Sequence, residues 1–149
     1  MLKRFSLLFI VLTLLTFLMV PAMADPGGGD NDQSITFNDF LNALNMVEAS
    51  GKHANVRPGD NGKAIGPFQI WRVYWQDAVE HDPTIGGKYS DCNNYDYSVK
   101  IVKSYLHRYG GRFIKTGNWE ALARIHNGGP HGYNRPATIP YWERVQNNL

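Results

Sequence analysis

Two carboxylates are the strongest candidates for acid–base chemistry. Glu48 follows Leu41 and Leu44 by seven and four residues, a spacing that places all three on one face of a helix. Because that face is apolar, the Glu48 carboxyl is expected to be partly shielded from water. Shielding disfavours the ionised form of a carboxyl, which suits a general acid. A Glu in a last helical turn can also point into solvent, and periodicity alone leaves both interpretations open.

The second carboxylate, Asp60, lies twelve residues after Glu48, in the turn sequence Gly59-Asp-Asn-Gly62. A protonated acid on a helix that faces an ionised carboxylate on a polar loop is the arrangement that glycosidases use. Asp is also common in Gly-rich turns for its turn-forming ability alone. The segment lacks the alternate acidic ligands and the terminal Glu of a calcium loop. The pair therefore predicts glycoside hydrolysis, with simple turn chemistry as the alternative for Asp60.

Five further residues could line a cleft for sugars. Gln69 can hydrogen-bond a hydroxyl-rich ligand and the ring of Tyr74 can stack on it, although Tyr74 lies at helical spacing from apolar residues and could be core. His126 could likewise be either a buried structural residue or part of the cleft. The turn that follows it begins with Asn127-Gly128, where backbone can approach a ligand, and this favours a place in the cleft. The five histidines have no Cys partner and no close i, i+4 pair, so no metal or other cofactor is expected.

A mainly helical scaffold is predicted to hold these residues. Apolar spacing and capping residues predict helices over 37–51, 67–80, 96–109, 119–126 and from about 138 onward, with Gly110-Gly111 closing the third. The Gly- and Pro-rich stretch 52–68 predicts a loop with at most two short strands. Thr138 is expected to cap the last helix, and the four tryptophans are expected in the core. The predicted class is therefore α+β, mainly helical, in one domain with a small β-hairpin.

Composition and charge narrow the function classes. The chain has 149 residues, of which 43% are hydrophobic and 19% charged, an ordinary balance for one globular domain. Its formal charge of +2 is too small for a dedicated nucleic-acid binder. Without Lys3 and Arg4 the basic count falls to thirteen, which equals the thirteen acidic residues. Cys92 is the only cysteine, so no intramolecular disulfide is possible, and Cys92 is interpreted as structural.

The first 24 residues predict a signal peptide. Lys3 and Arg4 precede the apolar run 5–20, and Ala22-Met-Ala24 has the small-residue pattern of a cleavage site. The run is shorter than the ~20 residues that a spanning helix needs, and an uncleaved anchor is the alternative. We expect cleavage after Ala24, a secreted or periplasmic location, a flexible linker over residues 25–33 and a catalytic domain over 34–149.

Three sequence blocks resemble those of the invertebrate-type lysozymes, the destabilase family. They are Glu48-Ala-Ser-Gly51, Gly59-Asp-Asn-Gly-Lys-Ala-Ile-Gly-Pro-Phe-Gln-Ile70 and Ala123-Arg-Ile-His-Asn-Gly-Gly-Pro130. The resemblance covers roughly residues 37–145, and the last two blocks are specific when they occur together in this order.

The resemblance implies a lysozyme-like fold and secreted action on the glycan strands of peptidoglycan. The implied reaction is cleavage of the β-1,4 bond between N-acetylmuramic acid and N-acetylglucosamine, with Glu48 as general acid and Asp60 as nucleophile of a retaining mechanism. Animal members are rich in disulfides, whereas this chain is similar to a cysteine-poor, bacterial-like branch. Some members are credited with isopeptidase activity through a serine. Ser50 and Ser90 are the mid-chain candidates, and neither has a base beside it in the sequence.

The sequence is also compatible with two other functions. The Glu48-Ala-Ser and Gly-Pro-Phe-Gln blocks also resemble those of lytic transglycosylases, which need one acid, so Glu48 could act alone. A non-catalytic glycan-binding module could use the same cleft. The presence of Asp60 favours hydrolysis over both alternatives.

Overall fold

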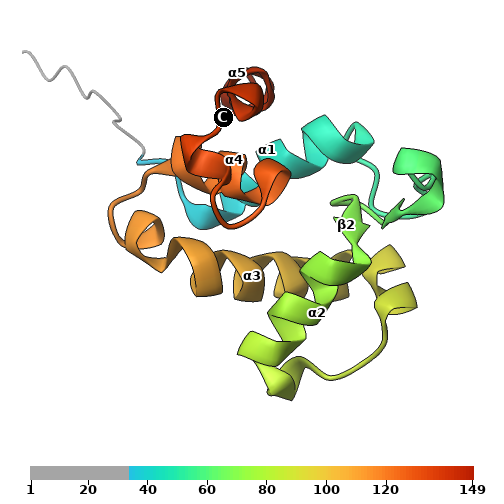
Figure 1. Cartoon of the computed structure of the whole chain (residues 1–149). Helices are drawn as coiled ribbons and strands as arrows, with labels where there is room; N and C mark the ends of the chain where they lie inside the picture. Colours follow the sequence, from blue (N-terminus) through green and yellow to red (C-terminus); the bar gives the residue numbers. More distant parts are fainter. Residues whose placement is uncertain (1–33) are drawn as a thin grey trace, which may run out of the picture. The chain divides into compact units, whose positions relative to one another are not determined.

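The computed structural model describes residues 34–149 and is drawn as a ribbon in Figure 1. The predicted signal peptide and linker lie outside these residues and stay predictions. Within residues 34–149, no helix combines the length and apolar character needed to cross a membrane.

Five α-helices and one small sheet make up the described part of the chain. The helices are α1 (Phe37–Ala49), α2 (Arg72–His81), α3 (Tyr95–Lys115), α4 (Trp119–Gly128) and α5 (Ile139–Gln146). Strands β1 (Ala64–Ile65) and β2 (Ile70–Trp71) pair antiparallel, with Ala64 opposite Trp71. Short 3-10 turns complete the connections, among them η1 (Asp60–Gly62). The predicted mainly helical class with a small hairpin is confirmed.

The helices of the domain pack against one another mainly through the long helix α3 and through α5. Helices α2 and α4 pack on α3, while α5 packs on α1 and α4 (Figure 1). Between them lies one core of buried side chains, in which Phe40, Leu44, Ile101, Leu106 and Leu122 are fully enclosed. Burial of apolar area at roughly 25 cal/mol per Å² is the main stabilising term for such a core.

Helix α1 begins where its sequence predicts and ends at Ala49, two residues before the predicted end. Thr36 and Asp39 form a capping box, in which each side chain accepts from the other's backbone N–H. Ser50 stops the helix in the left-handed region at φ 52°. One turn earlier, the buried Asn45 amide donates to the carbonyl oxygens of Lys52 and Pro67. These bonds tie the long loop to α1, so the helix that carries Glu48 also positions the loop that carries Asp60.

The predicted start of the second helix at Pro67 is wrong, because α2 begins at Arg72. Gln69 has a φ of 45°, which an α-helix does not accommodate, and Ile70 pairs with Ile65 in the hairpin. Helical spacing within the predicted helix 67–80 would also place Val73 on its inner side, but Val73 is 60% exposed. Because β2 ends at Trp71 and α2 begins at the next residue, the side chain of Val73 faces outward.

The predicted end of the third helix at Gly110-Gly111 is wrong, because α3 continues to Lys115. Gly110 lies against α4, and a Cβ there would stand 2.6 Å from Cδ2 of Leu122. The glycine therefore allows two helices to approach closely rather than ending one of them. The helix also starts at Tyr95, one residue before the predicted start, because Asn94 caps it by accepting from the backbone N–H of Tyr97.

Candidate active site

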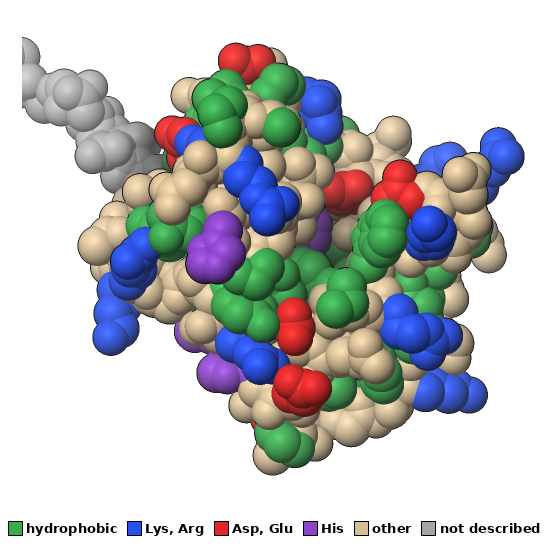
Figure 2. Space-filling model, in the orientation of Figure 1, with side chains coloured by type: hydrophobic (Ala, Val, Ile, Leu, Met, Phe, Trp, Pro, Cys, Tyr) green, Lys and Arg blue, Asp and Glu red, His purple; other side chains and the backbone are tan. Residues whose placement is uncertain are grey.

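All seven residues predicted for the site line one cavity of about 530 Å³. They are Glu48, Asp60, Gln69, Tyr74, His126, Asn127 and Gly128. They come from α1, η1, the hairpin turn, α2 and α4, so the chain folds back on itself several times to assemble the cavity. Figure 2 shows acidic side chains beside hydrophobic ones at the upper right of this face. Trp71, Val73, Tyr105, Gly129 and Arg135 also line the cavity, and sequence reasoning did not assign them to the site.

Glu48 projects from the last turn of α1 with 18% of its side chain exposed. Its Oε1 accepts a hydrogen bond of 2.7 Å from the hydroxyl of Tyr141 on α5. Nε2 of His126 lies 3.6 Å from the same oxygen. Of the two carboxyl oxygens, Oε1 thus has both contacts, and Oε2 is free of them. The Glu48 carboxyl is therefore partly shielded from water, as its place on the apolar face of the helix predicts, and does not point freely into solvent.

Tyr141 acts as a permanent hydrogen-bond donor to Glu48. Its side chain is buried, and burial, together with the nearby Glu48 and the hydrogen bond to it, raises the pKa of Tyr141 well above its usual range. The phenol therefore keeps its proton at any physiological pH. The sequence analysis did not single out Tyr141, because its helical position marks it only as a core residue.

His126 bridges Glu48 and Tyr74. The Tyr74 hydroxyl lies 3.0 Å from Nδ1 of His126, and burial in the first place, then the neighbouring Tyr105 and Glu48, raises the pKa of Tyr74 well above its usual range. A phenol that keeps its proton can donate to Nδ1, which leaves the hydrogen of a neutral imidazole on Nε2, facing Glu48. Tyr74 is both core and cavity wall, since its ring stacks on Tyr105 at 3.5 Å.

Asp60 stands in a different environment from Glu48. It is exposed on η1, where Asp60 and Asn61 both have positive φ, 47° and 56°. Its Oδ2 accepts a hydrogen bond of 3.0 Å from the indole N–H of Trp71. The expectation that Trp71 is core is wrong, because alternation along β2 buries Ile70 and leaves Trp71 41% exposed. That alternation was the sequence signal that could have identified Trp71.

Gln69 supports the loop of Asp60 rather than presenting its whole amide to the cavity. Its Nε2 donates to the carbonyl oxygens of Gly66 at 3.0 Å and Arg57 at 3.4 Å. Its Oε1 fills the space where a Cβ on Gly59 would stand. Only a glycine at position 59 lets the loop approach this side chain, and Asp60 follows directly.

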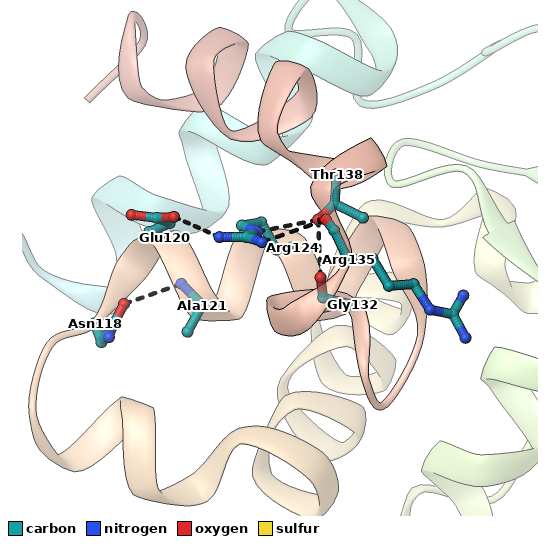
Figure 3. Close-up of polar contacts among 7 residues, drawn as sticks. All are labelled: Asn118, Glu120, Ala121, Arg124, Gly132, Arg135 and Thr138. Atoms are coloured by element: carbon teal, nitrogen blue, oxygen red, sulfur yellow. Dashed lines mark hydrogen bonds and ion pairs between the residues drawn. The ribbon is translucent and has the colours of Figure 1, made fainter.

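A polar network beyond the cavity fixes α4 against the start of α5 (Figure 3). Arg124 pairs with Glu120 at 2.6 Å and donates from Nε to the Thr138 hydroxyl at 3.0 Å. The same hydroxyl lies within donating distance of the carbonyl oxygens of Gly132, at 2.8 Å, and Arg135, at 2.7 Å, which share its one hydrogen. Thr138 is the N-cap residue of α5, as predicted, but its side chain accepts no hydrogen bond from the first turn of that helix. Its hydroxyl instead closes the loop that brings Tyr141 and His126 to Glu48.

Asn127 and Gly128 form the cavity wall at the end of α4. Arg135 donates from Nη1 to the Gly128 carbonyl oxygen at 3.0 Å. A Cβ on Gly128 would meet Cγ2 of Thr138 at 2.5 Å, so the glycine allows close packing here too. Asn127 is exposed at the cavity edge, where its amide is accessible to a ligand.

Neither a metal nor a reactive thiol marks the site. Within residues 34–149 no group of three or more His, Cys, Asp or Glu is placed to hold a metal ion. Cys92 is fully buried, and burial raises the pKa of its thiol to about 12, so it stays protonated and unreactive in the folded protein.

Comparison with known proteins gives consistent matches. The family model described as Destabilase matches residues 39–148. The lysozyme of Ostrea edulis is 37% identical over 56% of this chain and 59% of its own length. The chain spans less than two thirds of this and the other oyster lysozymes it matches.

Two crystal structures share the fold. That of Tapes japonica lysozyme has a TM-score of 0.61 and 33% identity, covering 72% of this chain and 86% of that one. A second, of Aeromonas hydrophila PliI in complex with Meretrix lusoria lysozyme, has a TM-score of 0.60 and 26% identity, covering 75% and 89%.

Proposed function

Since the chain belongs to the Destabilase family, which includes invertebrate-type lysozymes, we propose that it is a secreted peptidoglycan hydrolase. The substrate is the glycan strand, and the bond cleaved is the β-1,4 linkage between N-acetylmuramic acid and N-acetylglucosamine. Glu48 is the general acid and Asp60 the nucleophile.

One observation carries the proposal: Glu48 and Asp60 line the same cavity from different elements and in unlike environments. Glu48 is enclosed by α4 and α5, whereas Asp60 is exposed on a turn. Two carboxyls with separate environments can divide the roles of acid and nucleophile in glycoside cleavage.

Glu48 is suited to protonate the leaving oxygen through Oε2. Tyr141 and His126 both contact Oε1, so they hold the carboxyl in one orientation and leave Oε2 for the substrate. A general acid in hydrogen-bonding reach contributes roughly 10²–10⁴-fold to rate.

Asp60 is suited to attack the anomeric carbon through Oδ1, because Trp71 holds Oδ2. The resulting covalent glycosyl-enzyme is then hydrolysed by water, with Glu48 acting as base in this second step. Asn127 and Gly128 line the same cavity, which supports a role for them in hydrogen-bonding the sugar.

The test compares Glu48→Gln and Asp60→Asn with matched exposed controls, Glu143→Gln on α5 and Asp96→Asn on α3, using purified peptidoglycan and mass analysis of the products. Both site variants should lose at least about 10²-fold activity, the controls should stay near wild type, and the wild-type products should carry reducing ends. Anhydro products with an active Asp60→Asn variant would identify a transglycosylase instead. Binding without any cleavage would identify a glycan-binding module.

Secretion rests on the signal-like segment 1–24, which lies outside the described residues. Expression of the full chain in a bacterial host followed by mass measurement of exported protein tests it. The expected mature N-terminus is Asp25, and a product that retains Met1 in the membrane fraction would show an anchor.

A further inference from the structure

A second cavity of about 410 Å³ adjoins the candidate active cavity. Trp71 and Val73 line both. These two side chains are 41% and 60% exposed, so they form an apolar floor that is open to water and continuous with the site of Asp60. Exposed apolar side chains that line a cavity next to a site favour a ligand contact.

Two cations stand around this apolar floor. Lys63 and Arg72 both line the second cavity and both are exposed. Nζ of Lys63 lies 5.7 Å from the ring centroid of Trp71, and Cζ of Arg72 lies 4.5 Å from that of Tyr89. Cation–π contacts at such distances hold a charged side chain near the ring without cancelling its charge.

Neither cation is neutralised by a carboxylate within the described chain. Among residues 34–149, no ion pair within 4.0 Å involves Lys63 or Arg72. Tyr89 is itself fixed, because its hydroxyl lies 2.8 Å from the carbonyl oxygens of both Lys63 and Ile70, which share its one hydrogen. The second cavity thus presents two positive charges on an anchored aromatic and apolar surface.

We propose that this second cavity binds the acidic stem peptide that peptidoglycan carries on N-acetylmuramic acid, with Lys63 and Arg72 pairing with its free carboxylates. The inference rests on the proposed function, because it extends the ligand of the same site from the sugar to its attached peptide. The peptide combines small apolar side chains with carboxylates, which matches the floor of Trp71 and Val73 and the two cations beside it.

The covalent link between the stem peptide and its sugar explains how two exposed charges can contribute to binding. An exposed ion pair alone contributes little, because water and salt screen it. The stem peptide, however, is joined to a sugar that the neighbouring cavity holds, so it meets Lys63 and Arg72 at a high effective concentration. Substrates with stem peptides should therefore bind more tightly than the same glycan without them.

The experiment measures binding, so that it does not depend on turnover. Soluble glycan strands are prepared in two forms from one peptidoglycan, intact and with the stem peptides removed by an amidase. Each is titrated into the Glu48→Gln protein by calorimetry, or into Asp60→Asn protein if the first variant does not fold. We expect the stem-bearing strands to bind about tenfold more tightly, and this ratio to fall as salt rises.

Two double variants locate the effect. Lys63→Gln with Arg72→Gln should bring the affinity for stem-bearing strands down to that for bare strands, while the affinity for bare strands stays unchanged. Lys100→Gln with Lys115→Gln removes the same charge from α3, at two lysines that line neither cavity, and should preserve the ratio. Equal binding of the two glycans, or an equal loss on both glycans with the first pair, would overturn the inference.

The outcomes also separate this inference from the proposed function. If wild-type protein cleaves neither glycan yet binds the stem-bearing form preferentially through Lys63 and Arg72, the hydrolase proposal fails and the peptide site stands. If it cleaves both glycans and binds them equally, only the peptide site fails.

Discussion

The hydroxyl of Tyr141 donates a 2.7 Å hydrogen bond to Oε1 of Glu48 across 93 residues of sequence. It joins the last helix of the chain to the first, at the residue through which α1 lines the cavity. The bond orients the candidate acid, and the buried phenol can supply it at all physiological pH values because the pKa of Tyr141 is raised.

Replacing Tyr141 by Phe should lower both activity and stability while preserving the packing. The ring stays, but the Glu48 oxygen loses its donor, so we expect a loss of about 1 kcal/mol in the free energy of unfolding and about tenfold in activity. Urea denaturation and peptidoglycan turnover measure the two. Tyr133→Phe, in another cavity, is the control. Wild-type activity in Tyr141→Phe would show that the bond does not orient the acid.

Trp71→Phe should impair activity with little change in stability. Trp71 is 41% exposed, so the fold depends little on it, and we expect a change in unfolding free energy within about 0.5 kcal/mol. Asp60 loses the donor to its Oδ2, so turnover should fall about tenfold through misorientation of the nucleophile. Thermal unfolding and kcat on bare glycan strands are the measurements. An unchanged kcat would mean that Trp71 does not position Asp60.

Two adjacent glycines of α3 should respond to alanine in opposite directions. Gly111→Ala should stabilise by roughly 0.5–1 kcal/mol, because a Cβ there meets nothing within 4 Å. Gly110→Ala should destabilise by about 1–3 kcal/mol, since its Cβ would lie 2.6 Å from Leu122 and 3.3 Å from Ile125, both fully buried. Chemical denaturation of both variants provides the comparison. Stabilisation by both would show that α4 can move away.

Cys92 should resist alkylation in the native protein. Burial, the larger cause, and the nearby Asp91 raise the pKa of its thiol to about 12, so almost no thiolate forms at pH 8, and reagents have no access. Iodoacetamide at pH 8 should leave the folded chain unmodified and add one group in guanidinium, as mass measurement would show. Rapid labelling under native conditions would show local opening around η3 (Tyr89–Asn93), which carries Cys92.

The free energy of unfolding should fall at alkaline pH and not near neutral pH. Cys92, Tyr74 and Tyr141 all have folded-state pKa values above their unfolded ones. Groups shifted in this direction contribute stability that is complete below the unfolded pKa, 9.0 for the thiol and 10.0 for the phenols, and is lost as the pH rises further. The free energy of unfolding should therefore decline above about pH 9. Absorbance at 295 nm should show these two phenols ionising together with unfolding.

The sequence alone was sufficient to predict the local features of the structure. Thr36 caps α1, and Asn118 caps α4 by accepting from the backbone N–H of Ala121. These caps and the placement of Glu48 on the inner face of its helix follow from spacing within one turn or two. The turn of Asp60 follows from glycines beside it. These features depend on contacts between residues three or four apart, which a pattern of residue types encodes directly.

Long-range contacts decided the rest. Gly110 looks like a helix end until α4 is seen to pack against it, and Pro67 looks like a helix start until β1 and β2 pair. Tyr141 and Trp71 look like core residues, yet one orients Glu48 and the other holds Asp60. The structural role of each of these four residues depends on a partner that lies far away in the sequence or across the hairpin. Residue types do not specify such partners, because packing among all the helices together selects which distant side chains meet.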